Sequence, residues 1–110
     1  MKLPNGENAE IDPRKLTDYS LNHEHDDGKH KALLFQDVLG LGIENGDVLL
    51  EALRAAARDG EAVLGRSDRY GQRYMIDFMM AGPHRTARIR SAWIIAPNSI
   101  TPRLVTCYII

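Results

Sequence analysis

The residues of this chain best suited to chemistry are three arginines, a threonine and a tyrosine in its C-terminal half. Arg73, Arg88, Arg90, Thr106 and Tyr108 all occur where polar and apolar residues alternate. Side chains of a strand alternate between its two faces, so the pattern predicts that these five share one face of a sheet. Guanidinium groups bind phosphate through paired donors, and hydroxyl groups donate hydrogen bonds or protons to it. We therefore predict a phosphate-directed site with Arg90, Thr106 and Tyr108 as catalytic residues and with Arg73 and Arg88 as phosphate ligands. The alternative is an ordinary solvated sheet face.

This prediction depends on the register of the last strand. The favoured assignment buries Val105, Cys107 and Ile109, with Arg103 on the same face. The same assignment places Leu104, Thr106 and Tyr108 on the solvent-facing side. A slip of one residue reverses the two faces.

A second set of polar residues precedes a predicted helix at residues 29–39. His30 and Lys31 fall on its first turn, where the helix dipole and a cation favour an anion. We predict His30 as a further catalytic residue and Lys31 as a further phosphate ligand, with a solvated helix start as the alternative.

Histidines also cluster in the loop before this helix. His23, His25 and His30 lack the His-Glu-x-x-His spacing that aims two imidazoles at one zinc ion from a helix. The favoured interpretation is a capping loop with incidental histidines, so neither a metal nor another cofactor is predicted.

The elements that must position these residues change character near residue 60. Helical spacing and capping signals predict helices at residues 13–21, 29–39 and 48–59. Alternation predicts strands at residues 61–66, 72–80, 85–96 and 102–110, joined by short loops. The predicted fold class is α+β: N-terminal helices (residues 1–60) packed on one face of a four-stranded antiparallel meander (residues 61–110). We expect one domain over residues 1–110.

Composition limits the classes of function. The 110 residues are 44% hydrophobic and 26% charged, which is typical of soluble globular proteins. No apolar run is long enough for a membrane span, so we expect no membrane partner. The absence of a signal peptide and the single Cys107 predict a cytoplasmic protein, and this thiol is predicted to be buried and inert.

Charge is distributed unevenly along the chain. Residues 1–60 carry seven Lys or Arg against twelve Asp or Glu, a balance of −5. Residues 61–110 carry seven Arg, no Lys and three Asp or Glu, a balance of +4. An arginine-rich half suits phosphate. The asymmetry also suits self-association, or docking of the acidic half on a basic partner.

Several motifs resemble a family of small bacterial proteins of unknown function that is frequent in cyanobacteria. They are Gly28-Lys29-His30-Lys31-Ala32, Tyr70-Gly71-Gln72-Arg73-Tyr74, Ser91-Ala92-Trp93-Ile94 and the run from Pro102 to Tyr108. The openings Leu3-Pro4-Asn5 and Ile11–Leu16 are similar too, so the resemblance covers almost the whole chain. Members of that family also occur as C-terminal modules where toxin nucleases are common.

The predicted architecture also resembles the barnase, colicin and RelE-type ribonuclease group. Those enzymes cleave RNA without metal, by attack of the 2′-hydroxyl on the adjacent phosphate. The resemblance implies that Arg73, Arg88 and Arg90 hold phosphate, that Tyr108 serves as acid or base, and that His30 reaches in from its helix. The chain departs from better-known members in lacking a His or Glu base on the sheet.

Two hypotheses of different classes follow. The first is an RNA-directed, metal-independent ribonuclease-like and toxin-related module, or its non-catalytic relative, with RNA as its partner. The alternative is a protein–protein interaction module without catalytic activity, either an adaptor, an immunity-type protein or a homodimer.

Overall fold

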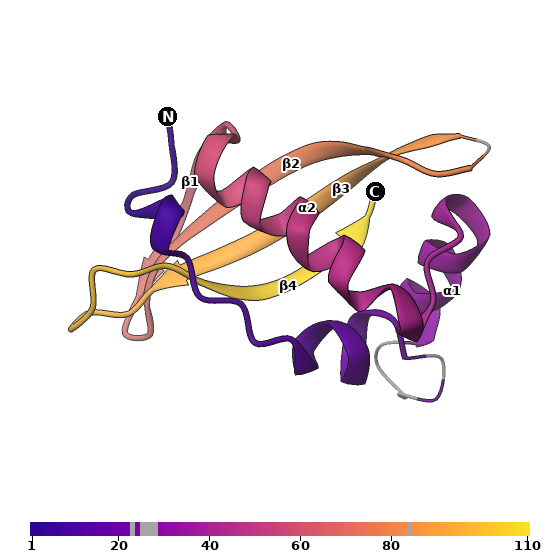
Figure 1. Cartoon of the computed structure of the whole chain (residues 1–110). Coiled ribbons are helices and arrows are strands. Elements are labelled where there is room, and N and C mark those ends of the chain that lie inside the picture. The colour runs from indigo at the N-terminus through magenta and orange to yellow at the C-terminus, as the bar shows by residue number, and fades with distance from the viewer. Residues whose placement is uncertain (23, 25–28, 84) are drawn as a thin grey trace.

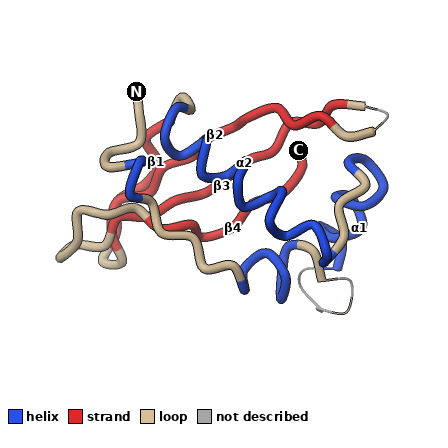
Figure 2. Tube along the Cα trace, viewed as in Figure 1, coloured by secondary structure: helices blue, strands red, loops and turns tan. Residues whose placement is uncertain are grey.

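The computed structural model of the chain describes residues 1–22, 24, 29–83 and 85–110. Helical elements come first and strands follow (Figures 1 and 2). The short helical turns are η1 (Gly6–Asn8), η2 (Leu16–Ser20) and η3 (Ile43–Asn45). The helices and strands are α1 (Lys29–Leu39), α2 (Gly46–Asp59), β1 (Ala62–Asp68), β2 (Gly71–Ala81), β3 (Thr86–Ile95) and β4 (Arg103–Ile109). No helix in the described part of the chain is long and apolar enough to cross a membrane.

The four strands form one antiparallel sheet in the order β1-β2-β3-β4, so each strand pairs with its neighbour in sequence. Figure 1 shows α2 lying along one face of this sheet. The α+β meander with its helices on one face is therefore confirmed. One face of the sheet is covered by helices, and we call the other the open face.

Helix α2 follows the predicted apolar stripe. Leu49, Leu53, Ala56 and Ala57 are buried on its sheet-facing side, which the spacing of 3.6 residues per turn brings together. The helix ends before Gly60, as predicted. Burial of this stripe fixes α2 against the sheet and leaves its charged side to solvent.

The first eleven residues, for which no helix or strand was predicted, pack against the core and the edge of β4. Leu3 and Ile11 are buried in the core, and the chain beside them runs parallel to the start of β4. The Glu10 N–H donates to the Pro102 carbonyl at 2.8 Å, and the Leu104 N–H donates to the Glu10 carbonyl at 2.9 Å. The helix predicted at residues 13–21 forms over residues 14–20, and most of it is the π-helical turn η2. The N-terminal segment therefore covers part of the outer edge of β4.

The centre of the core is the indole of Trp93, which is fully buried. Its Nε1–H donates to Ser91 Oγ at 2.9 Å, and this hydroxyl donates to the Ile76 carbonyl at 2.8 Å. Two buried polar side chains are thereby satisfied without water.

The register of β4 combines the two assignments considered above. Cys107 pairs with Ser91 and is buried, as predicted, but Leu104 pairs with Trp93 and is buried as well. A bulge between these pairs adds one residue, Val105, to β4. The predictions for Leu104 and Val105 were wrong, because a bulge exempts the residues before it from strict alternation. Arg103 pairs with Ile94, which places it on the open-face side instead of with Cys107.

The turn between β1 and β2 requires a glycine, and this gives a first prediction. Gly71 has φ of +135°, and a Cβ at this position would lie 2.1 Å from the Ile95 carbonyl oxygen. Gly71→Ala is expected to lower the free energy of unfolding by more than about 1 kcal/mol, measured by urea denaturation. Gly42→Ala is the control, because its Cβ meets only the mobile end of the Glu44 side chain. A similar loss in both variants would contradict the prediction.

Candidate functional site

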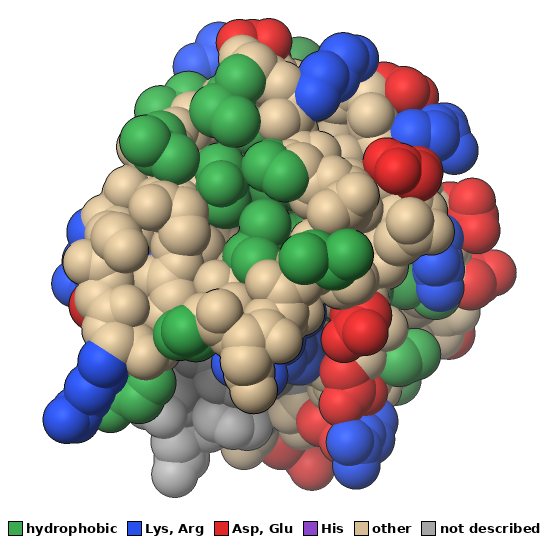
Figure 3. Space-filling model, turned by 90° about the vertical axis from the view of Figure 1, so that its left-hand side faces the viewer, with side chains coloured by type: hydrophobic (Ala, Val, Ile, Leu, Met, Phe, Trp, Pro, Cys, Tyr) green, Lys and Arg blue, Asp and Glu red, His purple; other side chains and the backbone are tan. Residues whose placement is uncertain are grey.

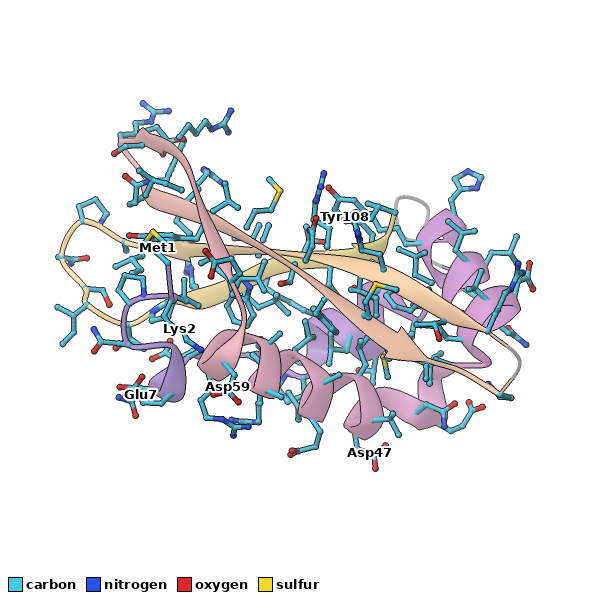
Figure 4. The ribbon with its side chains drawn as sticks, turned by 90° about the horizontal axis from the view of Figure 1, so that it is seen from above. Met1, Lys2, Glu7, Asp47, Asp59 and Tyr108 are labelled. Atoms are coloured by element: carbon cyan, nitrogen blue, oxygen red, sulfur yellow. The ribbon has the colours of Figure 1, made fainter. Side chains whose placement is uncertain are left out.

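The open face carries a row of polar side chains at the middle of the sheet. Asp77, Arg90 and Tyr108 lie opposite one another on β2, β3 and β4. The Arg90 guanidinium donates to both carboxylate oxygens of Asp77, at 2.9 and 3.0 Å. Figure 4 shows Tyr108 on the side of the sheet away from the labelled Lys2 and Asp59. A cation held in a fixed orientation therefore lies beside a phenol.

Helix α1 brings a second cation to the same place. Lys31 Nζ donates to Thr106 Oγ1 at 3.3 Å, and it lies 5.1 Å from the centre of the Tyr108 ring. Thr106 and Tyr108 are two residues apart on β4, so both point to the open face. Lys31 thus reaches past the edge of the sheet from a helix that packs against β4.

Lys15 completes this cationic edge. Its Nζ donates to the Val105 carbonyl at 3.4 Å. Lys15, Lys31, Val105 and Thr106 line a hollow of about 310 Å³. A hollow with two ammonium groups and one hydroxyl suits a small anionic group such as a phosphate.

Mutual hydrogen bonding stabilises the charged forms of the central pair. The hydrogen bonds from Arg90 hold the pKa of Asp77 below its usual value, although desolvation opposes this. Asp77 in turn raises the pKa of Arg90, and Tyr108 adds to the effect. The bidentate contact uses two of the five guanidinium N–H donors, which leaves three that can bind an anion.

The sequence-predicted residues are only partly brought together. Arg90, Thr106, Tyr108 and Lys31 meet as described. Arg73 lies farther along β2, where it contacts Asp68 at 3.4 Å. The other two predicted residues are exposed: Arg88 lies on β3, and His30 lies on the first turn of α1. Among the described residues, neither side chain makes a hydrogen bond or ion pair, although the charge of Arg88 helps to lower the pKa of Asp77.

The structure describes only some of the histidines that were considered as metal ligands. His23 and His25 lie outside the described residues. Within the described ranges, no three His, Cys, Asp or Glu side chains are grouped closely enough to hold a metal ion.

Comparison with known proteins identifies the family. The model of the domain of unknown function DUF6883 matches residues 2–110. The chain belongs to this family. Comparison with curated protein sequences gave no match. This DUF6883 domain is similar in structure to a chain in a contact-dependent growth inhibition toxin–immunity protein complex from Klebsiella pneumoniae 342. The TM-score is 0.69 at 19% identity, and the match covers 91% of this chain and 98% of that chain. At this identity the likeness shows the fold.

Two residues of the candidate site in this DUF6883 domain were missed by sequence reasoning. Asp77 stands on the predicted polar face of its strand, but its contact with Arg90 depends on the pairing of β2 with β3. Lys15 lies 90 residues before Val105, and only the docked N-terminal segment brings the two together. No local sequence signal indicates either contact, because both result from long-range packing.

The buried thiol on the opposite face of β4 gives a pH prediction. Burial raises the pKa of Cys107 to about 11 from an ordinary value of 9.0, although the contact with Ser20 opposes this. The native state therefore holds the thiol proton more tightly than the unfolded chain. We expect this contribution to stability to be complete below pH 9 and to be lost as pH rises to about 11.

The measurement compares urea unfolding of the native protein and Cys107→Ala across this alkaline range. Other groups titrate there in both proteins, so the difference between the two slopes isolates the thiol. The native protein is expected to lose stability more steeply. Parallel slopes would show that Cys107 makes no such contribution.

Proposed function

We propose that this domain is an RNA-directed, metal-independent ribonuclease-like module whose site is the open face of the sheet. The observation that carries the proposal is the meeting of Lys31, Thr106, Tyr108 and Arg90 at one place. Two cations and two hydroxyls suit a phosphodiester that gains charge during reaction. The structural neighbour from a toxin–immunity complex supports a toxin-related role.

The reaction proposed is an internal transfer at phosphorus. The 2′-oxygen of a ribose bonds to the adjacent phosphorus while the bond to the 5′-oxygen breaks, which leaves a 2′,3′-cyclic phosphate and a 5′-hydroxyl. One proton leaves the 2′-hydroxyl and one is added to the 5′-oxygen. Lys31 and Arg90 stabilise the added negative charge, and Thr106 donates a hydrogen bond to a phosphate oxygen.

The proton transfers are assigned to Tyr108 and His30. Tyr108 is the proposed proton donor to the 5′-oxygen, because its phenol lies between the two cations. His30 is the proposed acceptor, because it precedes Lys31 on the first turn of α1, is exposed there, and carries an imidazole that can act as a general base. Arg88 and Arg73 are proposed to bind flanking phosphates.

The test is cleavage of single-stranded RNA in the presence of a chelator, with the ends identified by mass spectrometry. We expect cyclic phosphate ends from the native protein, and loss of cleavage when Tyr108→Phe is combined with Arg90→Ala. The matched control is Arg58→Ala, which removes a cation from the solvent-facing side of α2. A native protein that neither cleaves nor binds RNA at low salt, where phosphate contacts are strongest, would contradict the proposal.

A separate observation supports the alternative of a protein-binding module. Val63 and Leu64 on β1 are 64% and 60% exposed, and Ile100 in the β3–β4 loop is 74% exposed. Figure 3 shows hydrophobic side chains gathered in the middle of that view, with charged side chains around them. Exposed apolar area of this kind is typical of protein interfaces. The neighbour from a toxin–immunity complex fits an immunity-type or adaptor role as well.

Self-association is the form of this alternative that purified protein can test. Sedimentation velocity over a range of concentrations would detect a homodimer, and Val63→Glu would be expected to dissociate it. A monomer at all concentrations would rule out the homodimer. A protein that cleaves RNA as a monomer would favour the ribonuclease-like function.

A further inference from the structure

A second hollow on the open face adjoins the one at Lys31. It has a volume of about 470 Å³, and its lining includes Arg66, Arg73, Met75 and Ala92. Val105 and Thr106 line both hollows. A ligand bound at Lys31 can therefore continue into the second hollow over these two residues.

The floor of this second hollow is mostly apolar, with the Thr106 hydroxyl at one end, and it is recessed at Ala92. Met75, Ala92 and Thr106 lie opposite one another on β2, β3 and β4. The single methyl group of Ala92 leaves a depression between two longer side chains. A shallow, mostly apolar floor of this kind suits the flat face of a nucleobase. The volume of the hollow is within the range of small-molecule sites.

The far end of the hollow is cationic. Arg66 and Arg73 both contact Asp68, at 3.3 and 3.4 Å. Two guanidinium groups share one carboxylate, so the group keeps one net positive charge. The Arg66 side chain is 74% exposed and can turn toward a ligand. An exposed guanidinium binds phosphate and also stacks on bases.

On the basis of the ribonuclease-like function, we propose that this hollow binds the neighbouring nucleobase and the next phosphate of a single-stranded RNA. The reacting phosphate lies at Lys31 and Arg90, the base lies over Ala92, and the next phosphate lies at Arg66 and Arg73. Arg73 is two strands and two residues from Thr106, a Cα separation of about 12 Å. This distance is too long for one phosphate group to span, so the far cations serve a second one.

The experiment measures binding of 2′-O-methyl oligonucleotides, which lack the attacking hydroxyl and are not cleaved. A trinucleotide adds one base and one phosphate to a dinucleotide. We expect the native protein to bind the trinucleotide about tenfold more tightly than the dinucleotide by calorimetry. Ala92→Leu fills the depression and is expected to abolish this difference.

Charge variants test the phosphate end of the hollow. Arg66→Gln is expected to reduce the salt dependence of trinucleotide binding by about 0.7 in the slope of log K against log salt, and to leave that of the dinucleotide unchanged. Arg69→Gln is the matched control on the same hairpin, because Arg69 contacts the Tyr70 ring and hydroxyl instead.

The outcomes separate this inference from the ribonuclease-like function itself. Equal affinity of the native protein for the two oligonucleotides, or equal effects of Arg66→Gln and Arg69→Gln, would overturn the second subsite. Cleavage of RNA would then still support the function. Tighter trinucleotide binding without cleavage of unmodified RNA would support the subsite and contradict the nuclease chemistry.

Discussion

Lys31→Met is expected to lower the single-turnover rate of RNA cleavage by about 10²–10³-fold, the loss typical of removing one preorganised charge from a transition state. The reason is geometric. Lys31 Nζ lies 3.3 Å from Thr106 Oγ1 and over the Tyr108 ring, on the side of the sheet where the phosphate is proposed to bind. Methionine keeps most of the side-chain length and removes the ammonium group alone.

The control for this variant is Lys2→Met, which removes the same charge from another part of the molecule. Lys2 Nζ donates to the Asp59 carbonyl at 2.7 Å, and Figure 4 shows both residues across the sheet from Tyr108. We expect its rate to remain within about twofold of the native rate, since a single exposed charge there has no contact with the site. Similar rates in the two variants would remove Lys31 from the mechanism.

Trp93→Ala is expected to lower the free energy of unfolding by about 3–5 kcal/mol. The indole is fully buried, and its loss leaves a large cavity between the sheet and the helices. Because domains of this kind are stable by about 5–15 kcal/mol, the variant is expected to lie near the threshold of unfolding. The measurement is urea denaturation followed by circular dichroism, since the chain has one tryptophan and the variant loses its fluorescence.

Ile100→Ala is the control for burial. Ile100 is also a large apolar residue, but it is exposed in the β3–β4 loop. Its replacement is expected to change stability by no more than about 0.5 kcal/mol. A small effect of Trp93→Ala would contradict the prediction and show that the core closes around the missing indole.

The fold was largely predictable because its main signals are local. The apolar stripe of α2 and the alternation along most of β2 and β3 each indicate both an element and the side that it buries. Gly40 marks the end of α1 in the same way, because its φ of +68° favours glycine and the next N–H turns back to the Phe35 carbonyl. The docking of Leu3 and Ile11 has no such signal, since short polar stretches give no period to follow.

The face that carries the candidate site was predictable, but which residues gather on it was predictable only in part. Alternation indicated that Arg90, Thr106 and Tyr108 share a face, and the register confirms that they do. It also assigned Arg73 and Arg88 to this cluster, although Arg73 lies four residues along β2 from Asp77 and Arg88 lies two residues along β3 from Arg90. Alternation indicates which face of the sheet a side chain lies on. The distance between two side chains on that face depends on how the strands pair. Asp77 and Lys15 were missed for the same reason.

The bulge in β4 gives Val105 an unusual status. Trp93 pairs with Leu104 and the preceding Ala92 pairs with Thr106, so the residues on either side of Val105 already match two adjacent positions of β3. Shortening most strands by one residue would turn half of the strand inside out. Loss of Val105 would instead join two segments that are already in phase. Val105 is surplus to the ladder, and its contribution is to the lining of the two hollows on the open face. The extra residue of β4 therefore serves the lining of the open-face hollows, while the pairing of β4 with β3 does not require it.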